Sequence, residues 1–184
     1  ADYVLKRTPG DTVSNLSSTR ALKDITEKYG HRYYAAAVGE VNVVEEMIKR
    51  GAVIGGEGNG GVIYPKLHYG RDALVGIALL LTYLADTRMK VTEMRRMYPD
   101  YVIAKKKIDL PDGVDFRHIL SEVKDRFSGH QIDERDGMRI EHAEGWVQVR
   151  KSNTEPVIRI YAEGRNAQEA ENLANGIIEI VKKI

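Results

Sequence analysis

The sequence predicts an α/β protein in two parts: a three-layer α/β domain with a mixed sheet over residues 1–97, and a small α+β domain over residues 98–184. In the first part, short apolar runs alternate with segments whose apolar residues recur at helical spacing, which is typical of a largely parallel sheet between helices. In the second part, short strands follow one another across turns, which favours an antiparallel sheet, here with two helices. The boundary falls near Tyr98, at the turn signal Tyr98-Pro99-Asp100.

The elements of the first part are marked by apolar periodicity and by the glycines that end them. Residues 1–6 resemble the middle of a helix, so we expect the chain to be a segment of a longer protein. Gly30 and Gly51 follow two predicted helices, and glycine ends a helix readily. The helix predicted over residues 72–88 is apolar at nearly every position, so we expect it to be buried on more than one side. The remaining predicted elements are strands over residues 12–17, 33–38 and 52–54 and helices over residues 18–29 and 40–50.

The second part begins with a strand over residues 101–108, which ends at the turn Leu110-Pro111-Asp112-Gly113. An amphipathic helix over residues 116–127 follows, and a second helix over residues 167–184 carries its apolar residues on one stripe. Between the two helices, Asp136-Gly137 and Glu144-Gly145 are typical of hairpin turns. They delimit three short strands near residues 138–142, 146–150 and 157–163.

The composition excludes several classes of function. The chain has 28 basic and 27 acidic residues, so it lacks the basic surplus typical of proteins that bind nucleic acid or membrane surfaces. The basic run Lys105-Lys106-Lys107 is interpreted as an exposed strand edge, where lysines discourage pairing with other chains. Without cysteine there is no disulfide, thiolate nucleophile or cysteine-based zinc site. No apolar stretch is long enough to span a bilayer, and we expect a cytoplasmic protein.

The most informative segment is Arg150-Lys151-Ser152-Asn153-Thr154-Glu155-Pro156, with Arg159 three residues further on. Arginine supplies planar, bidentate donors, and serine, asparagine and threonine add short donors beside backbone N–H groups. This combination suits a phosphate dianion. A polar turn between two strands, ended by Pro156, accounts for the same residues. On this segment alone, both interpretations stay open.

A second candidate site is the glycine loop, residues 55–61, with the sequence Gly55-Gly56-Glu57-Gly58-Asn59-Gly60-Gly61. Its spacing matches the dinucleotide fingerprint G-x-G-x-x-G, which needs a helix directly after it. The next residues are Val62-Ile63-Tyr64-Pro65, which argue against a helix and therefore against a nicotinamide or flavin site. Glu57 and Asn59 instead suit the vicinal hydroxyls of a sugar ring. The alternative is a structural hairpin whose Glu57 is merely solvated.

The two loops together resemble those of the α-D-phosphohexomutase family. The similarity lies in the sugar loop Gly56-Glu57-Gly58-Asn59-Gly60 and in the phosphate loop Arg150 to Pro156 with Arg159. The segments Val38-Gly39-Glu40-Val41-Asn42 and Arg71-Asp72-Ala73-Leu74 are similar too. The resemblance covers essentially the whole chain and implies the third and fourth of four domains. The chain departs from the commoner bacterial pattern of this family at two positions: Asn59 stands where serine is frequent, and Gly61 stands where histidine is frequent.

The resemblance implies a function for the longer protein. Family members interconvert hexose 1-phosphates and 6-phosphates through a phosphoserine and a bisphosphorylated sugar, with Mg²⁺ beside the serine. Both the serine loop and the metal loop belong to an upstream domain that has no counterpart here. The implied cofactors are therefore Mg²⁺ held by that domain and a hexose 1,6-bisphosphate as intermediate. The implied partners are a small phosphosugar and the N-terminal domains of the same chain, with no nucleic acid and no membrane.

The resemblance also assigns site residues, with no catalytic residue and no metal ligand in this segment. The sugar would contact Glu57, Gly58, Asn59 and Glu40, and the non-reacting phosphate would contact Arg150, Ser152, Asn153, Thr154 and Arg159. For Glu40 a first-turn acid that complements the helix dipole is an equal interpretation. The two loops are expected to bind opposite ends of one phosphosugar, and the segment alone is expected to be inactive. The sugar stays open among glucosamine, mannose and glucose phosphates.

Two other classes of function are possible from the sequence. A non-catalytic sugar-phosphate-binding module would use the same two loops, and only the sequence upstream of Ala1 would distinguish it. An RNA-binding α+β module would fit the predicted topology of the second part. It would need exposed aromatic residues and a basic face, whereas the charge is balanced and the chain has only two phenylalanines.

Overall fold

A computed structural model describes residues 1–110, 113–152 and 155–184 of the chain. The chain forms two compact units, Ala1–Pro99 and Asp100–Ile184. The first unit contains α1 (Asp2–Leu5), β1 (Thr12–Asn15), α2 (Ala21–Lys28), β2 (Tyr33–Ala36), α3 (Glu40–Arg50), β3 (Ile54–Gly56), β4 (Val62–Ile63), α4 (Ala73–Thr87) and α5 (Val91–Arg95). The second contains β5 (Val102–Asp109), α6 (Phe116–Arg126), β6 (Ile132–Asp133), β7 (Met138–Glu141), β8 (Trp146–Lys151), β9 (Val157–Gly164) and α7 (Ala167–Val181).

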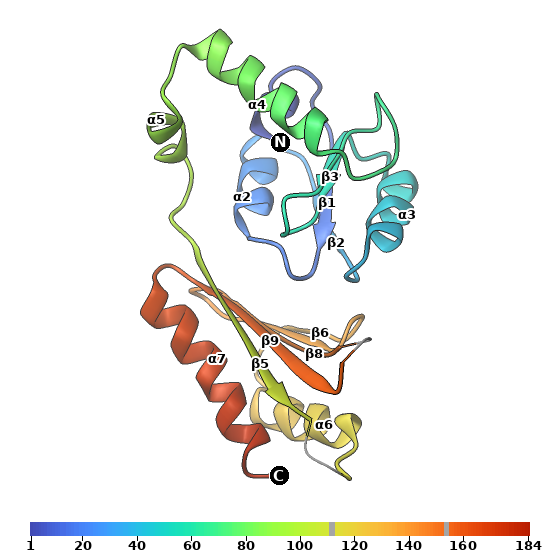
Figure 1. Ribbon diagram of the computed structural model, residues 1–184, viewed down its shortest axis with the longest axis vertical. Helices are drawn as coiled ribbons and strands as arrows, with labels where there is room; N and C mark the ends of the chain where they lie inside the picture. The colour runs from blue at the N-terminus through green and yellow to red at the C-terminus, as the bar shows by residue number, and fades with distance from the viewer. Residues whose placement is uncertain (111–112, 153–154) are drawn as a thin grey trace. The chain divides into compact units, whose positions relative to one another are not determined.

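The first unit is built on a mixed four-stranded sheet in the order β2-β1-β3-β4. Strands β2, β1 and β3 are parallel, and β4 runs antiparallel to β3. Helices α2 and α3 lie on opposite sides of this sheet (Figure 1). The three-layer α/β domain with a mixed sheet is therefore confirmed. Its buried core consists of Val13, Ala36, Val43, Met47, Ala52 and Ile63.

A glycine brings α3 close to the sheet. A Cβ atom at Gly55 would lie 2.4 Å from the sulfur of Met47, a residue of α3 that is fully buried. Any side chain at this position of β3 would push the helix away from the strand. The close packing fixes the start of the glycine loop against the core of the unit.

Helix α4 forms where the sequence predicts it, but its predicted burial is wrong. Asp72 caps its first turn by accepting a hydrogen bond from the backbone N–H of Val75 at 3.0 Å. Of its residues, only Tyr83 is buried, whereas Leu74 and Leu81 are 76% and 60% exposed. The reason is that α4 packs mainly on α1 and β4, so a helix with apolar residues on every side is covered along one side. Uninterrupted apolar sequence therefore predicted the helix correctly and overestimated how much of it would be covered.

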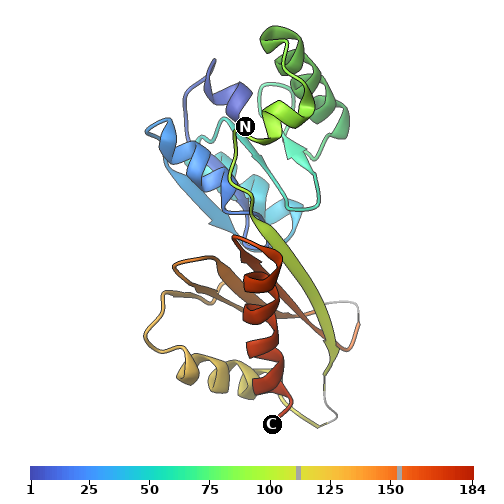
Figure 2. The ribbon, with the colours of Figure 1, turned by 90° about the vertical axis from the view of Figure 1, so that its left-hand side faces the viewer.

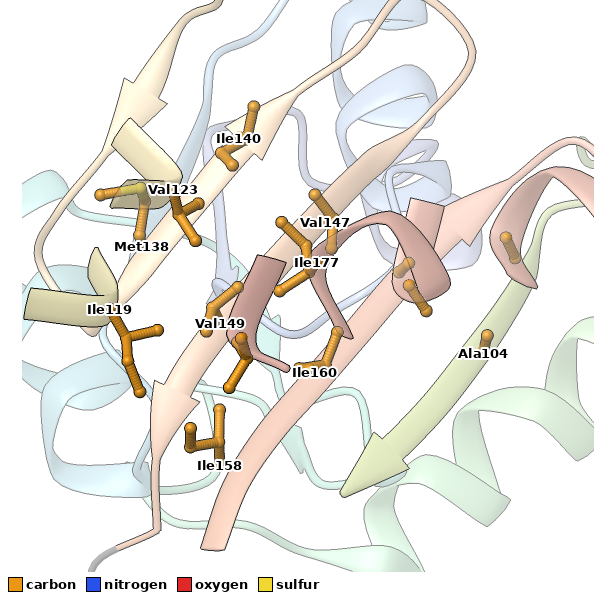
Figure 3. Packing of buried hydrophobic residues seen from close by; sticks show 14 residues of the cluster. Ala104, Ile119, Val123, Met138, Ile140, Val147, Val149, Ile158, Ile160 and Ile177 are labelled. Atoms are coloured by element: carbon orange, nitrogen blue, oxygen red, sulfur yellow. The ribbon is translucent and has the colours of Figure 1, made fainter. Parts of the chain in front are cut away.

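The second unit is the predicted antiparallel sheet with two helices. Its five strands lie in the order β5-β9-β8-β7-β6, and every neighbouring pair is antiparallel. Figure 1 and Figure 2 show α6 and α7 on one face of this sheet. Figure 3 shows Ile119 and Val123 of α6 and Ile177 of α7 packed against the strand residues Val147, Val149, Ile158 and Ile160. These side chains form the core of the unit.

Three short elements are absent from the predictions: β4, β6 and α5. The strands have two residues each, and α5 has five. Among the described residues, no helix combines the length and the apolar character that crossing a bilayer requires.

Candidate functional site

The glycine loop is a tight β-hairpin between β3 and β4. The backbone N–H of Glu57 donates to the carbonyl of Gly61 at 2.9 Å, and the N–H of Gly60 donates to the carbonyl of Glu57 at 3.1 Å. Gly60 has a φ of 91°, which other residues rarely adopt. Asn59 shapes the turn as well, because its Oδ1 accepts from the N–H of Gly61 at 3.2 Å. The loop therefore forms the hairpin that the sequence offered as an alternative to a sugar site.

Glu57 is not solvated as that alternative supposed, because its side chain is only 4% exposed. One carboxylate oxygen, Oε1, accepts from Asn15 Nδ2 at 3.0 Å and from the backbone N–H of Gly39 at 3.2 Å. The other oxygen, Oε2, lies 3.0 Å from Nη1 of Arg71. The end of β1 and the segments just before α3 and α4 thus hold one carboxylate in place. Its orientation is fixed before any ligand arrives.

Arg71 connects Glu57 to Glu40. Its Nε donates to Oε2 of Glu40 at 2.8 Å, and its backbone N–H donates to Oε1 of Glu40 at 3.1 Å. These hydrogen bonds, the side-chain one first, hold the pKa of Glu40 below its ordinary value. The pKa of the Arg71 guanidinium is raised, chiefly by its hydrogen bond to Glu40 and next by the charge of Glu57. Glu40 thus stands at the start of α3, as predicted, and is joined to the glycine loop through a shared guanidinium.

Glycines make room for this arrangement. A Cβ atom at Gly61 would lie 2.5 Å from Cδ of Arg71, so the aliphatic stem of Arg71 occupies the space that a side chain would need. A Cβ atom at Gly58 would lie 2.8 Å from the carbonyl oxygen of Ser17, which places the loop directly against the segment after β1. The absence of a side chain at Gly61 is therefore complementary to Arg71.

Sequence reasoning missed Arg71 and Asn15 as parts of the site. Asn15 is the last residue of β1, and ligand-facing side chains in parallel sheets cluster beyond the carboxyl ends of strands, so its position was a usable signal. Arg71 immediately precedes the N-cap of α4, and its segment resembled the family without being assigned a role in the site.

In the second unit, the predicted phosphate-binding arginines lie side by side. Arg150 of β8 and Arg159 of β9 are directly paired across the two strands. Like charges in such a pair are destabilising unless something compensates them. Nη2 of Arg159 donates to Oε2 of Glu155 at 3.1 Å and to Oγ of the buried Ser152 at 3.4 Å. By contrast, Nε of Arg150 is buried and has no hydrogen-bond partner among the described residues.

The surroundings of Arg150 are closely packed. A Cβ atom at Gly137 would lie 2.8 Å from Cα of Arg150 and 2.1 Å from the carbonyl oxygen of Val149. The predicted turn at Asp136-Gly137 therefore lies directly beside β8, and glycine is needed for this approach. Two of the predicted phosphate-binding residues, Asn153 and Thr154, lie outside the described residues.

The described residues include no group of three or more histidine, aspartate or glutamate side chains placed to hold a metal ion.

The predicted site residues of the two units differ in charge. The first unit presents carboxylates that are fixed by an arginine, which can accept hydrogen bonds from hydroxyls. The second presents two arginines and a serine, which can donate to an anion.

Family models match both units. Residues 1–101 match the family described as phosphoglucomutase/phosphomannomutase, alpha/beta/alpha domain III, and residues 89–180 match phosphoglucomutase/phosphomannomutase, C-terminal domain. The chain belongs to this family. The resemblance to the third and fourth domains of phosphohexomutases is thereby confirmed.

Relatives within the phosphoglucomutase/phosphomannomutase family carry different substrate names. The chain is 33% identical to a phosphoglucosamine/phosphogalactosamine mutase of Sulfurisphaera tokodaii, over 94% of this chain and 37% of that protein. It is 34% identical to a phosphoglucomutase/phosphomannomutase of Thermococcus kodakarensis, over 96% of this chain and 39% of that protein. A phosphoglucomutase/phosphomannomutase family protein of Burkholderia thailandensis has the same fold, with a TM-score of 0.78 at 24% identity over 98% of this chain and 40% of the other. The chain spans about two fifths of the length of these proteins.

Proposed function

We propose that this chain supplies the sugar-binding and phosphate-binding parts of a phosphohexomutase. Such an enzyme interconverts hexose 1-phosphate and hexose 6-phosphate through a phosphoserine and a bisphosphorylated sugar. The observation that carries the proposal is the direct pairing of Arg150 with Arg159, together with the buried Nε of Arg150, which has no partner among the described residues. A phosphate dianion would compensate the two positive charges and would accept from that donor.

The glycine loop would bind the sugar ring. A carboxylate has about four acceptor positions. Asn15, Gly39 and Arg71 each occupy one of those on Glu57, which leaves about one for a sugar hydroxyl. Asn59 is exposed and retains its amide N–H groups as donors, and Glu40 is 36% exposed beside Arg71. Gly58 would allow the ring to approach the backbone. Few hydroxyl contacts suit a substrate that must bind in two orientations.

The phosphate loop would hold the phosphate that is not reacting. Arg150, Arg159 and Ser152, with Asn153 and Thr154, would donate hydrogen bonds to its oxygens. Fixing one end of the substrate orients the other end, and orientation contributes roughly 7–11 kcal/mol to catalysis in favourable cases. Mg²⁺, bound in an upstream domain, would neutralise charge at the phosphoryl group that transfers. This chain's own residues bind and orient, and they take no part in proton or phosphoryl transfer.

The sugar could be a glucosamine, mannose or glucose phosphate. The relatives bear names from more than one of these classes. A net negative charge around the glycine loop, where Glu40 and Glu57 share Arg71, would favour an amino sugar, whose ammonium group is cationic. Comparing glucosamine 6-phosphate, mannose 6-phosphate and glucose 6-phosphate in one binding assay would decide between them.

The substitution Arg150→Ala tests the proposal. We expect it to weaken the binding of hexose 6-phosphates to this chain ten- to a hundredfold, because a charge-assisted hydrogen bond contributes about 1.5–3 kcal/mol. Isothermal titration calorimetry with the 184-residue chain would measure the dissociation constants, and circular dichroism would show that the variant is folded. Equal affinities of the two proteins would contradict the proposal.

A further inference from the structure

The register of the sheet in the second unit brings a third cation into line with the two arginines. Strand β5 pairs with β9 so that Lys107 lies directly opposite Arg159, and β9 pairs with β8 so that Arg159 lies directly opposite Arg150. Directly paired residues project from the same face of a sheet. We call Lys107, Arg159 and Arg150 the basic row. It crosses three adjacent strands, although its members lie far apart in the sequence.

The basic row lies on the face of the sheet opposite α6 and α7. Ile158 and Ile160, the neighbours of Arg159 along β9, belong to the core beneath the two helices. Side chains alternate between faces along a strand, so Arg159 and its partners project to the other side. The row is therefore separate from the hydrophobic core.

Positive charge in the row exceeds the negative charge beside it. Glu155 pairs with Arg159, and Asp109 lies two residues beyond Lys107 on the same face of β5. With Lys105, which lies two residues before Lys107 on the same face, four cations thus stand near two carboxylates. The described residues provide no ion pair for Lys107 and none for Arg150. Adjacent like charges of this kind are unfavourable in the free protein, and an anion would relieve them.

The other two lysines of the same run have different surroundings. Lys106 projects to the helix side of the sheet and pairs with Glu171 of α7 at 2.7 Å. Lys105 lies opposite Tyr161, and its Nζ is 5.6 Å from the centre of that ring. Strand β5 is an edge strand, as the interpretation of the run required. That interpretation does not explain why Lys107 alone aligns with the two arginines.

We propose that Lys107 is a further phosphate-binding residue, which together with Arg159 and Arg150 holds the phosphate group of a phosphomonoester. The proposal rests on the proposed function of the phosphate loop and extends it to β5. A phosphomonoester carries about −1.5 to −2 charges at pH 7 and three acceptor oxygens. Three cations on adjacent strands can each face one of these oxygens. The ammonium group of a lysine, on its flexible stem, supplies positive charge at the site, whereas the planar guanidinium groups of the arginines fix the directions of the hydrogen bonds.

The three lysines provide matched variants for the test. Inorganic phosphate and glucose 6-phosphate would be titrated into the 184-residue chain and into Lys107→Ala, Lys107→Arg, Lys105→Ala, Lys106→Ala and Arg150→Ala. We expect Lys107→Ala to weaken both ligands about fivefold, as for a partly screened contact between charges. We expect Lys105→Ala and Lys106→Ala to change the affinity less than twofold, and Lys107→Arg to retain most of it. Chemical shifts of the backbone amides would show that each variant is folded.

The outcomes separate this inference from the proposed function. If Lys107→Ala binds like the parent chain while Arg150→Ala binds weakly, Lys107 has no role and the phosphate loop keeps its function. If all three alanine variants at Lys105, Lys106 and Lys107 weaken binding equally, the effect is one of general charge and the inference is also wrong. If neither Arg150→Ala nor Lys107→Ala matters, the proposed function itself falls.

Discussion

At the scale of single residues, the glycine loop is organised around one buried carboxylate. Glu57 receives hydrogen bonds from Asn15, Gly39 and Arg71, which belong to three separate segments of the first unit. A charged group with so little exposure is costly unless it is paired. Arg71 provides the only formal positive charge among these three partners. We therefore regard Arg71 as a residue that positions Glu57.

We predict that Arg71→Ala destabilises the first unit, because it leaves the buried carboxylate of Glu57 without its cation. Arg71 itself is 43% exposed, so solvent screens the charges and moderates the loss. Urea unfolding at pH 7 would measure the free energy of unfolding. Lys23→Ala is the control, because Lys23 pairs with Glu27 at 3.9 Å and both side chains are about half exposed. The prediction is wrong if the two variants differ by less than 0.5 kcal/mol, a threshold of about the size of one surface contact.

At the same scale, the sequence predicted site residues from distinctive residue types, and it gave no indication of the residues that the fold places beside them. Glu57, Arg150 and Arg159 stand in short runs of unusual composition. Asn15 contacts Glu57 although 42 positions separate them, and a single sequence does not show which distant residues come into contact. Lys107 was interpreted as a strand-edge lysine. Its alignment with Arg159 was not predicted, because that alignment depends on strand register. Register is fixed by the packing of the whole sheet and cannot be read from the residues of one strand.

At the scale of elements, predictability followed length. Helix α3 begins and ends at the predicted residues 40 and 50, since apolar spacing and Gly51 both mark it. Strands β4 and β6 have two residues each, too few to show an alternating pattern. Helix α4 was found from its apolar run, but the same run predicted burial that the structure does not provide. Periodicity reports which residues can be buried, and neighbouring elements decide which of them are.

A cluster around Asp2 joins several elements of the first unit. Its carboxylate accepts hydrogen bonds from the hydroxyls of Tyr29 at 2.5 Å, Tyr98 at 2.6 Å and Tyr83 at 2.7 Å. Burial alone would raise the pKa of Asp2, but the three hydroxyls outweigh burial and lower it to about 2. The cluster thereby ties α1 to the end of α2, to α4 and to the segment after α5.

This lowered pKa predicts a dependence of stability on pH. A carboxyl group whose pKa is lower in the folded protein stabilises it above the ordinary pKa of about 4 and ceases to do so as the pH falls towards 2. We expect Asp2→Asn to be less stable than the parent chain at pH 7, with a difference that shrinks between pH 4 and pH 2, the range set by these two pKa values. Thermal unfolding across that range would measure it. A difference that stays constant down to pH 2 would show that the protonation of Asp2 is not involved.

At the scale of the whole molecule, the family assignment and the two folds were predictable because residue type and order carry them. The division of work between the units is a proposal that follows from the charges of their sites. The apolar surface of α4 remains without a described cover over Leu74, Ile77 and Leu81, which are all more than half exposed. Exposed apolar surface on this scale promotes association, so binding experiments should be run at several protein concentrations.

The last prediction concerns catalysis by the chain as a whole. We expect the 184-residue chain to bind hexose phosphates without interconverting them, because the residues proposed to contact the substrate only bind and orient it. A coupled assay for glucose 6-phosphate formation from glucose 1-phosphate, with Mg²⁺ and glucose 1,6-bisphosphate present, would measure turnover. The Thermococcus kodakarensis relative is a suitable positive control, since its name includes phosphoglucomutase. Turnover that co-purifies with this chain and disappears in Arg150→Ala would mean that catalytic groups lie within these two units, and the proposal that this chain only binds and orients the substrate would then be wrong.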